Sequence, residues 1–205
     1  MTDWLPLAAD DIVERLTDWL TSSAGIVRVA VDGPPAAAPD EFAASLLEEL
    51  QTRGRPGALI RAATFWRDAS LRLEYGHHDV ESYLSWLDAA ALRREALEPV
   101  VADRPRYLPS LRDPDTNRST RAAAVSAPDG LVLIVSGPLL LRHRLPFDRT
   151  IHLALTPAAR ARRTAEDDEW TLPAFDEYDA EVRPTETADV VIKLDDPRHP
   201  ALRWT

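Results

Sequence analysis

The side chains that could carry chemistry in this sequence are carboxylates, arginines and a few histidines. The 205 residues include no cysteine, and the only lysine is Lys193. Disulfides, thiolate metal sites and cysteine nucleophiles are therefore excluded. His77 and His78 are adjacent, so their side chains point apart, and no second cluster at ligand spacing accompanies them. We therefore expect no metal site, and no motif marks a catalytic residue.

The segment between residues 33 and 40 is the best-placed candidate for binding a ligand. It follows a β-branched apolar run over 26–31, which predicts a buried strand that ends in a sharp turn. It precedes an amphipathic pattern over 40–53, which predicts a helix with Asp40 as its N-cap. A strand, a loop of this length and a helix are the setting of the phosphate-binding pattern G-x-x-x-x-G-K-[ST].

The residues of this segment depart from the phosphate-binding pattern at most of its defining positions. Gly33 occupies the first glycine position, but Ala38 adds a Cβ at the second. Pro39 stands in place of the lysine, and Asp40 stands in place of the residue whose hydroxyl binds Mg²⁺. A carboxylate at a helix N-terminus occupies the favourable dipole position and repels phosphate. Prolines in the loop also remove backbone N–H donors, so we interpret the segment as a vestigial phosphate loop.

The rest of the chain alternates between strand and helix patterns. Further strands are expected over 58–63, 131–135, 149–155 and 189–192. Further helices are expected over 8–22, 80–97, 139–144 and 157–163. Residues 102–122 should form a hairpin or an ordered loop, and the acidic stretch 165–180 should be irregular. Continuous apolar strands that alternate with helices predict an α/β fold with a parallel sheet covered on both faces and a ligand site at the carboxyl ends of its strands.

Length and charge limit the possible domain organisation and the possible classes of partner. We expect an N-terminal helical extension over 1–24, one domain over 25–195 and a tail over 196–205. The net charge of −10 argues against a nucleic-acid partner. The acidic N-terminus does not resemble a signal peptide, and no apolar run is long enough for a membrane span, so we expect a cytoplasmic protein without a membrane partner. The expected partner is a nucleoside or another small molecule, and self-association into a homo-oligomer is a further expectation.

Several separate segments carry a resemblance to a known family. They are Val27–Asp40, Arg61–Arg67 with Tyr83–Leu92, Leu131–Leu141, and the E-x-R-P-x-x-x-A-D-x-V sequence over Glu181–Val191. The chain resembles the uridine kinase group of P-loop nucleoside kinases, in particular a divergent bacterial branch. The resemblance implies a three-layer α/β/α P-loop fold with a mostly parallel sheet and a short lid. It also implies transfer of the ATP γ-phosphoryl group to the 5′-hydroxyl of uridine or cytidine with Mg²⁺.

The same resemblance assigns residues to a substrate pocket and a lid. The pocket residues would be Asp32, Phe65, Trp66, Arg67, Tyr83, Tyr107 and Arg183. The aromatic side chains among them, together with Trp86, could stack a base or could simply be packed beneath a lid. The lid arginines would be Arg160, Arg162 and Arg163, which precede an acidic run. Ala63 and Ser136 occupy positions after strands where the family places acidic residues.

Three functions remain open on the sequence alone. The first is a uridine kinase-like protein that has lost phosphotransfer and serves a binding or regulatory role, with no cofactor and no catalytic residue. The second is an active nucleoside kinase that uses Mg²⁺ and ATP, in which Arg67 or a lid arginine replaces the missing lysine. The third is a binder of an unrelated small molecule that reuses the empty crevice. Loss of the lysine, the hydroxyl and two acids together favours the first.

Overall fold

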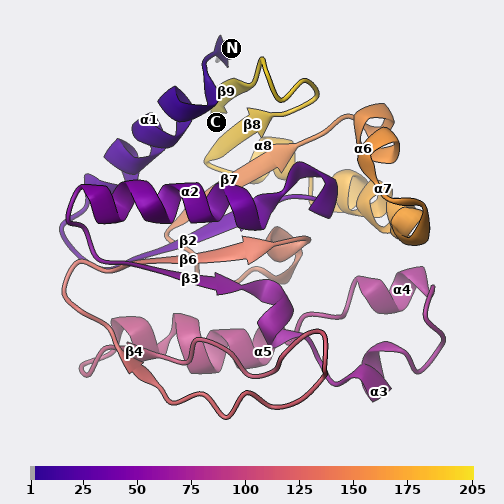
Figure 1. Ribbon diagram of the computed structural model, residues 1–205, viewed down its shortest axis with the longest axis horizontal. Coiled ribbons are helices and arrows are strands. Elements are labelled where there is room, and N and C mark those ends of the chain that lie inside the picture. The colour runs from indigo at the N-terminus through magenta and orange to yellow at the C-terminus, as the bar shows by residue number, and fades with distance from the viewer. Residues whose placement is uncertain (1–2) are drawn as a thin grey trace.

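A seven-stranded sheet forms the centre of the computed structural model, which describes residues 3–205 (Figure 1). Its strands are β1 (Leu5–Pro6), β2 (Val27–Asp32), β3 (Gly57–Arg61), β6 (Val132–Gly137), β7 (Arg149–Ala154), β8 (Val190–Lys193) and β9 (Ala201–Trp204). Their order is β1-β9-β8-β7-β2-β6-β3. The pairs from β3 to β8 are parallel, whereas β9 and β1 are antiparallel additions at one edge. A separate ribbon pairs β4 (Arg106–Tyr107) with β5 (Val125–Ser126).

The central strands are apolar because both of their faces are covered. All six residues of β6 are buried, and five of the six residues of β2 are buried. Such continuous runs are typical of parallel strands between two helical layers. The strands expected over 26–31, 131–135, 149–155 and 189–192 are confirmed within one or two residues at each end.

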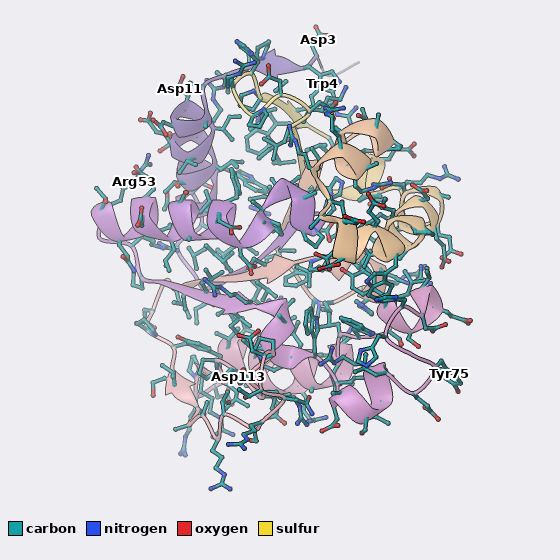
Figure 2. All side chains as sticks on the ribbon, turned by 45° about the vertical axis from the view of Figure 1, so that its right-hand side comes forward. Asp3, Trp4, Asp11, Arg53, Tyr75 and Asp113 are labelled. Atoms are coloured by element: carbon teal, nitrogen blue, oxygen red, sulfur yellow. The ribbon has the colours of Figure 1, made fainter. Side chains whose placement is uncertain are left out.

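Helices cover the two faces of the sheet and form two separate cores (Figure 1). On one face, α1 (Ala9–Thr21) and α2 (Pro39–Thr52) pack on alternate residues of β2, β6, β7 and β8. The acidic side of α1, which includes Asp11, faces solvent (Figure 2). On the other face, α5 (Ala89–Leu92) continues into a π-helical turn over Arg93–Leu97 and packs on the opposite side chains of β3 and β6. The expected α/β architecture, covered on both faces, is confirmed.

The remaining helices are short and lie mostly at the carboxyl ends of the strands. They are α3 (Ala69–Arg72), α4 (Val80–Tyr83), α6 (Pro157–Arg163), α7 (Leu172–Glu181) and α8 (Pro184–Thr187). Turns of 3-10 helix occur over Pro35–Ala37, Ala62–Phe65, Leu140–His143, Glu166–Thr171 and Pro99–Val101. The helix expected over 157–163 is confirmed, with the Thr156 hydroxyl accepting a hydrogen bond from the N–H of Ala159 and Pro157 at the first helical position.

Two sequence-based expectations for this end of the molecule are wrong. The single helix expected over 80–97 is interrupted, because Leu87 pairs with Trp66 and a new helix starts after Asp88, whose carboxylate caps the N–H of Ala91. The stretch 165–180 is helical rather than irregular. Pro173 lies in the first turn of α7, where proline is tolerated. The proline and the acidic residues before it therefore did not prevent a helix, although they led to the expectation of an irregular segment.

The two ends of the described chain meet at one edge of the sheet. Leu5 pairs with Leu202 in the β1–β9 ladder, and Leu202 is fully buried. Residues 201–204, which were expected to lie in a tail, therefore form part of the sheet, while the division into extension, domain and tail stays a prediction. A helix with the length and apolar character of a membrane span does not occur within residues 3–205.

Candidate functional site

The loop between β2 and α2 folds as a closed 3-10 turn. Backbone N–H groups of Ala37 and Ala38 donate to the carbonyls of Pro34 and Pro35 at 2.8 and 2.9 Å. The N–H of Gly33 donates to Gly137 across the sheet at 3.4 Å. The prolines at 34, 35 and 39 have no N–H. Two N–H groups of the loop therefore close its own turn, where a phosphate-binding loop would point such donors at an anion.

The start of α2 differs in one respect from the sequence-based expectation. The N-cap is Ala38, in the left-handed conformation with a φ of 54°, and Pro39 begins the helix. The expectation that Asp40 is the N-cap is therefore wrong. The Asp40 side chain instead accepts a hydrogen bond from the Ser136 hydroxyl at the end of β6, and one of its oxygens lies 3.8 Å from Nε of Arg61 at the end of β3. The carboxylate thus faces the strand ends.

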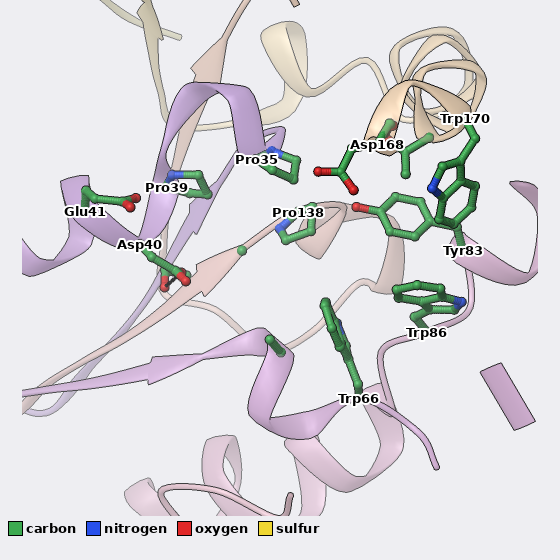
Figure 3. Close-up of a pocket in the computed structure, with 14 residues that line it drawn as sticks. Pro35, Pro39, Asp40, Glu41, Trp66, Tyr83, Trp86, Pro138, Asp168 and Trp170 are labelled. Atoms are coloured by element: carbon green, nitrogen blue, oxygen red, sulfur yellow. Dashed lines mark hydrogen bonds between the residues drawn. The ribbon is translucent and has the colours of Figure 1, made fainter. Parts of the chain in front are cut away.

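A cavity of about 380 Å³ opens beside this loop, at the carboxyl ends of β3 and β6 (Figure 3). Its walls combine aromatic, acidic and proline side chains from the β2–α2 loop, the segment after β3, α4 and the 3-10 turn before α7. The lining residues are Pro35, Pro39, Asp40, Glu41, Ala63, Trp66, Tyr83, Trp86, Ser136, Gly137, Pro138, Asp168, Trp170 and Thr171. A volume of this size suits a small organic ligand.

Four aromatic rings in this cavity form a contiguous cluster, the aromatic wall. Tyr83 contacts Trp86 and Trp170 with centroid distances of 5.0 and 5.5 Å. Trp86 also lies 5.2 Å from Trp66 and 5.8 Å from Trp170. The ring planes are mostly near perpendicular, which is the favourable edge-to-face geometry.

A buried arginine supports the aromatic wall without lining the cavity. The Arg72 guanidinium lies 5.0 Å from the ring centroid of Trp66 and 4.7 Å from that of Trp86. Its Nε donates to the carbonyl of Arg67 at 2.9 Å. Burial lowers the pKa of Arg72 from its ordinary value. An arginine guanidinium nevertheless stays protonated in proteins. Two rings of the wall are therefore already in contact with a cation.

Asp32 is buried behind the loop and does not line the cavity. One of its oxygens accepts the N–H of Leu140 at 2.8 Å, and the other lies 2.9 Å from the Tyr178 hydroxyl and 2.6 Å from Nδ1 of His152. Burial and the neighbouring charge of Asp32 raise the pKa of Tyr178 far above its usual range, so the hydroxyl remains a donor. This arrangement joins β2, β7 and α7.

The structure brings together only part of the residue set that the sequence assigned to substrate binding. Trp66 and Tyr83 line the cavity, and so do Pro39 and Asp40 of the loop. Phe65 is fully buried in the core below α5, and Arg67 is exposed outside the lining. Tyr107 lies on β4 and packs against the same core. Arg183 pairs with Glu186 at 3.6 Å on the surface of α8.

The expected lid arginines do not face the cavity. Arg160 is buried and forms ion pairs of 2.6 and 2.8 Å with Asp176 and Asp179 of α7. Arg163 donates to the carbonyl of Asp195, and Arg162 contacts only the carbonyl of Ala158. Arg160 and Arg163 therefore tie α6 to α7 and to the segment after β8, whereas the contact of Arg162 lies within α6 itself.

Glu41, Asp168 and Trp170 are cavity residues that the sequence reasoning missed. Asp168 and Trp170 belong to the acidic stretch that was expected to be irregular, so its geometry could not be anticipated. Glu41 lies in the first turn of a helix, where acidic residues usually only complement the helix dipole.

Comparisons with known proteins place the fold. No protein-family model matches the chain, and no curated protein matches it in sequence. Solved structures match over almost the whole chain. A "possible uridine kinase" from Bacillus stearothermophilus is 18% identical with a TM-score of 0.71 over 88% of this chain and 97% of that one.

Two further solved structures agree with this match. A "putative fructose transport system kinase" from Silicibacter sp. TM1040 is 19% identical with a TM-score of 0.61, over 89% of this chain and 95% of that one. The YGR205w protein is 8% identical with a TM-score of 0.60, over 97% of this chain and 99% of that one. Identity at this level establishes the fold. The chain therefore has the three-layer α/β/α fold of P-loop kinases, and uridine kinase-like structures are among those it resembles.

Proposed function

We propose that this chain is a uridine kinase-like P-loop protein that has lost ATP-dependent phosphoryl transfer and uses its remaining crevice to bind a small molecule. Phosphoryl transfer depends on positioning and on neutralising the charge of the transferred group. The loop beside the crevice has no lysine, three of its positions are prolines without an N–H, and the N–H groups of Ala37 and Ala38 donate within the loop.

The observation that carries the proposal is the position of Asp40. Its carboxylate lies in the first turn of α2 and is hydrogen-bonded to Ser136, at the place in this fold where phosphate would approach a helix N-terminus. A negative side chain there competes with a phosphate for the same favourable field and repels it. Together with the closed 3-10 turn, it makes the loop unsuited to a triphosphate.

The alternative of an active kinase with relocated cations receives less support. Arg160 is engaged by two aspartates, and Arg67 is outside the cavity lining. Arg61 approaches the cavity only through its contact with Asp40. Among residues 3–205, no arginine or lysine lines the cavity itself.

A coupled kinase assay with uridine, cytidine and Mg·ATP tests the proposal, combined with calorimetric titration of Mg·ATP into the full chain. We expect no turnover above background and no micromolar affinity. Turnover of either nucleoside would establish the active-kinase alternative. Micromolar binding of Mg·ATP without turnover would show that the nucleotide site survives and would also contradict the proposal.

A further inference from the structure

The charge of the cavity beside the β2–α2 loop does not suit an anionic ligand. Asp40, Glu41 and Asp168 line it. The carboxylates of Glu41 and Asp168 make no hydrogen bond or ion pair within residues 3–205, and both residues are exposed. Arg61 offsets Asp40 in part at 3.8 Å. A positively charged ligand would therefore gain Coulomb energy in this cavity, and a phosphate would lose it.

The hydroxyl of a buried tyrosine, Tyr83, faces the cavity. Tyr83 is only 6% exposed, and its hydroxyl makes no hydrogen bond with any residue from 3 to 205. Figure 3 shows the hydroxyl pointing into the cavity on the side of Asp168. Burial and the charge of Asp168 raise the pKa of Tyr83 above its ordinary value, so the group is a neutral O–H. Because this hydroxyl faces the cavity and can both donate and accept a hydrogen bond, it indicates a place for a polar atom of a ligand.

The aromatic wall supplies the second requirement for binding a cation. Faces and edges of Trp66, Trp86, Trp170 and Tyr83 surround one side of the cavity (Figure 3). Aromatic faces attract cations through their quadrupole, most strongly for tryptophan. Arg72 already lies over Trp66 and Trp86, outside the cavity lining. The charges of Arg72 and Arg61 together are outnumbered by the three carboxylates that line the cavity.

We propose that this cavity binds a small organic cation of the alkylammonium class. The charged nitrogen and its methyl or methylene groups would lie against the aromatic wall, near the Asp168 carboxylate, and a polar substituent would meet the Tyr83 hydroxyl. This inference rests on the proposed function and deepens it by naming the class of ligand. A neutral ligand that stacks on the aromatic wall would gain nothing from the lining carboxylates, whereas a cation is attracted by both the aromatic rings and the carboxylates.

Calorimetric titration of the full chain with choline tests the inference, with an uncharged isostere as the matched control. The isostere carries a tert-butyl group in place of the trimethylammonium group and has the same shape and hydroxyl. We expect saturable choline binding and at least about tenfold weaker binding of the isostere, because shape alone recovers neither the cation–π nor the carboxylate attraction.

Two variants locate the binding. Asp168→Asn removes one lining charge and should weaken choline binding about threefold to tenfold. Asp167→Asn removes an equal charge from a neighbouring exposed residue outside the lining and should leave the affinity unchanged within twofold. Because the two substitutions are equally conservative, a difference in choline affinity between the variants would show that choline binds in the cavity.

Several outcomes would overturn the inference. These are equal binding of choline and its isostere, no choline binding in the tens of millimolar, or equal effects of the two variants. Tighter binding of uridine than of choline would assign the cavity to a nucleoside instead. Kinase turnover, in contrast, would refute the proposed loss of phosphotransfer while choline binding could still be measured in the same samples, so the two failures are distinguishable.

Discussion

Two aspartates near the β2–α2 loop illustrate how position determines what a carboxylate does. Asp32 is completely buried and satisfied by contacts from three different segments. Asp40, eight residues later, is partly exposed and lines the cavity. The first carboxylate therefore has a structural role in joining β2, β7 and α7, whereas the second faces the cavity, where in our proposal it excludes phosphate.

Removing the charge of Asp40 should make the loop more tolerant of anions. Asp40→Asn keeps a side chain that can still bond Ser136 but removes the negative charge from the helix N-terminus. We expect the affinity for inorganic pyrophosphate to rise about twofold to fivefold, as measured by calorimetry. Glu48→Gln, on an exposed position of the same helix, is the control. An equal change in both variants would show that only net charge matters.

Removing the Tyr178 hydroxyl should destabilise the fold. Tyr178→Phe deletes the donor 2.9 Å from Asp32 and leaves a buried carboxylate with one partner fewer. We expect a loss of about 1.5–3 kcal/mol in the free energy of unfolding, measured by urea denaturation. Tyr75→Phe is the matched control because Tyr75 is 76% exposed and extends from the segment after α3 into solvent (Figure 2). A loss below 0.5 kcal/mol, the size of ordinary surface effects, would argue that Asp32 is not held by this contact.

At the scale of secondary-structure elements, hydrophobic periodicity predicted the buried strands and α2 correctly. It failed for the segment 80–97, where a contact between distant residues interrupts the helix. The continuous apolar runs of the strands and the amphipathic pattern of α2 are typical of an α/β fold. Gly54 follows the end of α2 with a φ of 70°, as its position in the sequence suggests. Trp66 and Leu87 pair across a bridge that breaks the helical pattern around them. A pairing between residues so far apart in sequence cannot be deduced from local spacing. The aromatic wall depends on that interruption.

One ion pair ties the start of β2 to the turn before β7, and it gives a pH-dependent prediction. Asp148 accepts from the backbone and guanidinium of Arg28 at 2.7–2.9 Å. Partial burial acts to raise the pKa of Asp148, but the hydrogen bonds and charge of Arg28 outweigh it and hold the pKa below its ordinary value of 3.8. A depressed pKa in the folded state stabilises the protein above the unfolded value, and this contribution is lost as the pH falls through the folded value.

The variant Asp148→Asn should show this dependence. We expect it to lower the free energy of unfolding by about 1 kcal/mol at pH 7, given that the pair is partly exposed. The difference from the unsubstituted protein should shrink as the pH falls from the unfolded value of about 4 through the lower folded value, because the folded carboxylate then becomes protonated. Urea denaturation across this range measures it. A difference that stays constant from neutral to acid pH would show that the contact contributes through shape rather than charge.

At the scale of the whole molecule, the sheet is completed by the end of the chain. β9 covers the edge of β8, and β1 in turn pairs with β9. Unpaired edges invite association with other chains, so this covering protects the apolar β8. The Pro-rich and charged composition after Asp195 predicted a tail, because the four residues of β9 are too few to give a clear strand pattern among prolines and charged residues. The fold class could be predicted from the sequence, whereas this edge could not.

The buried side chain of this last strand should matter as much as a central core residue. Leu202→Ala should lower the free energy of unfolding by about 2–4 kcal/mol because Leu202 is fully buried. Leu71→Ala, at a leucine that is 59% exposed, should change it by less than about 0.5 kcal/mol. Thermal and urea unfolding of both variants measure the difference. Similar small effects would mean that the C-terminal strand contributes little to global stability.

The uneven distribution of indole rings has a practical consequence. Trp66, Trp86 and Trp170 lie in a single cavity and make up half of the six tryptophans in the chain. Trp19 and Trp204 contact each other at a distance of 4.9 Å in a different part of the molecule, and Trp4 lies near Lys193. The intrinsic fluorescence of the unlabelled protein should therefore respond directly when a molecule enters or leaves the cavity, while the remaining indoles provide a steady background in the same spectrum.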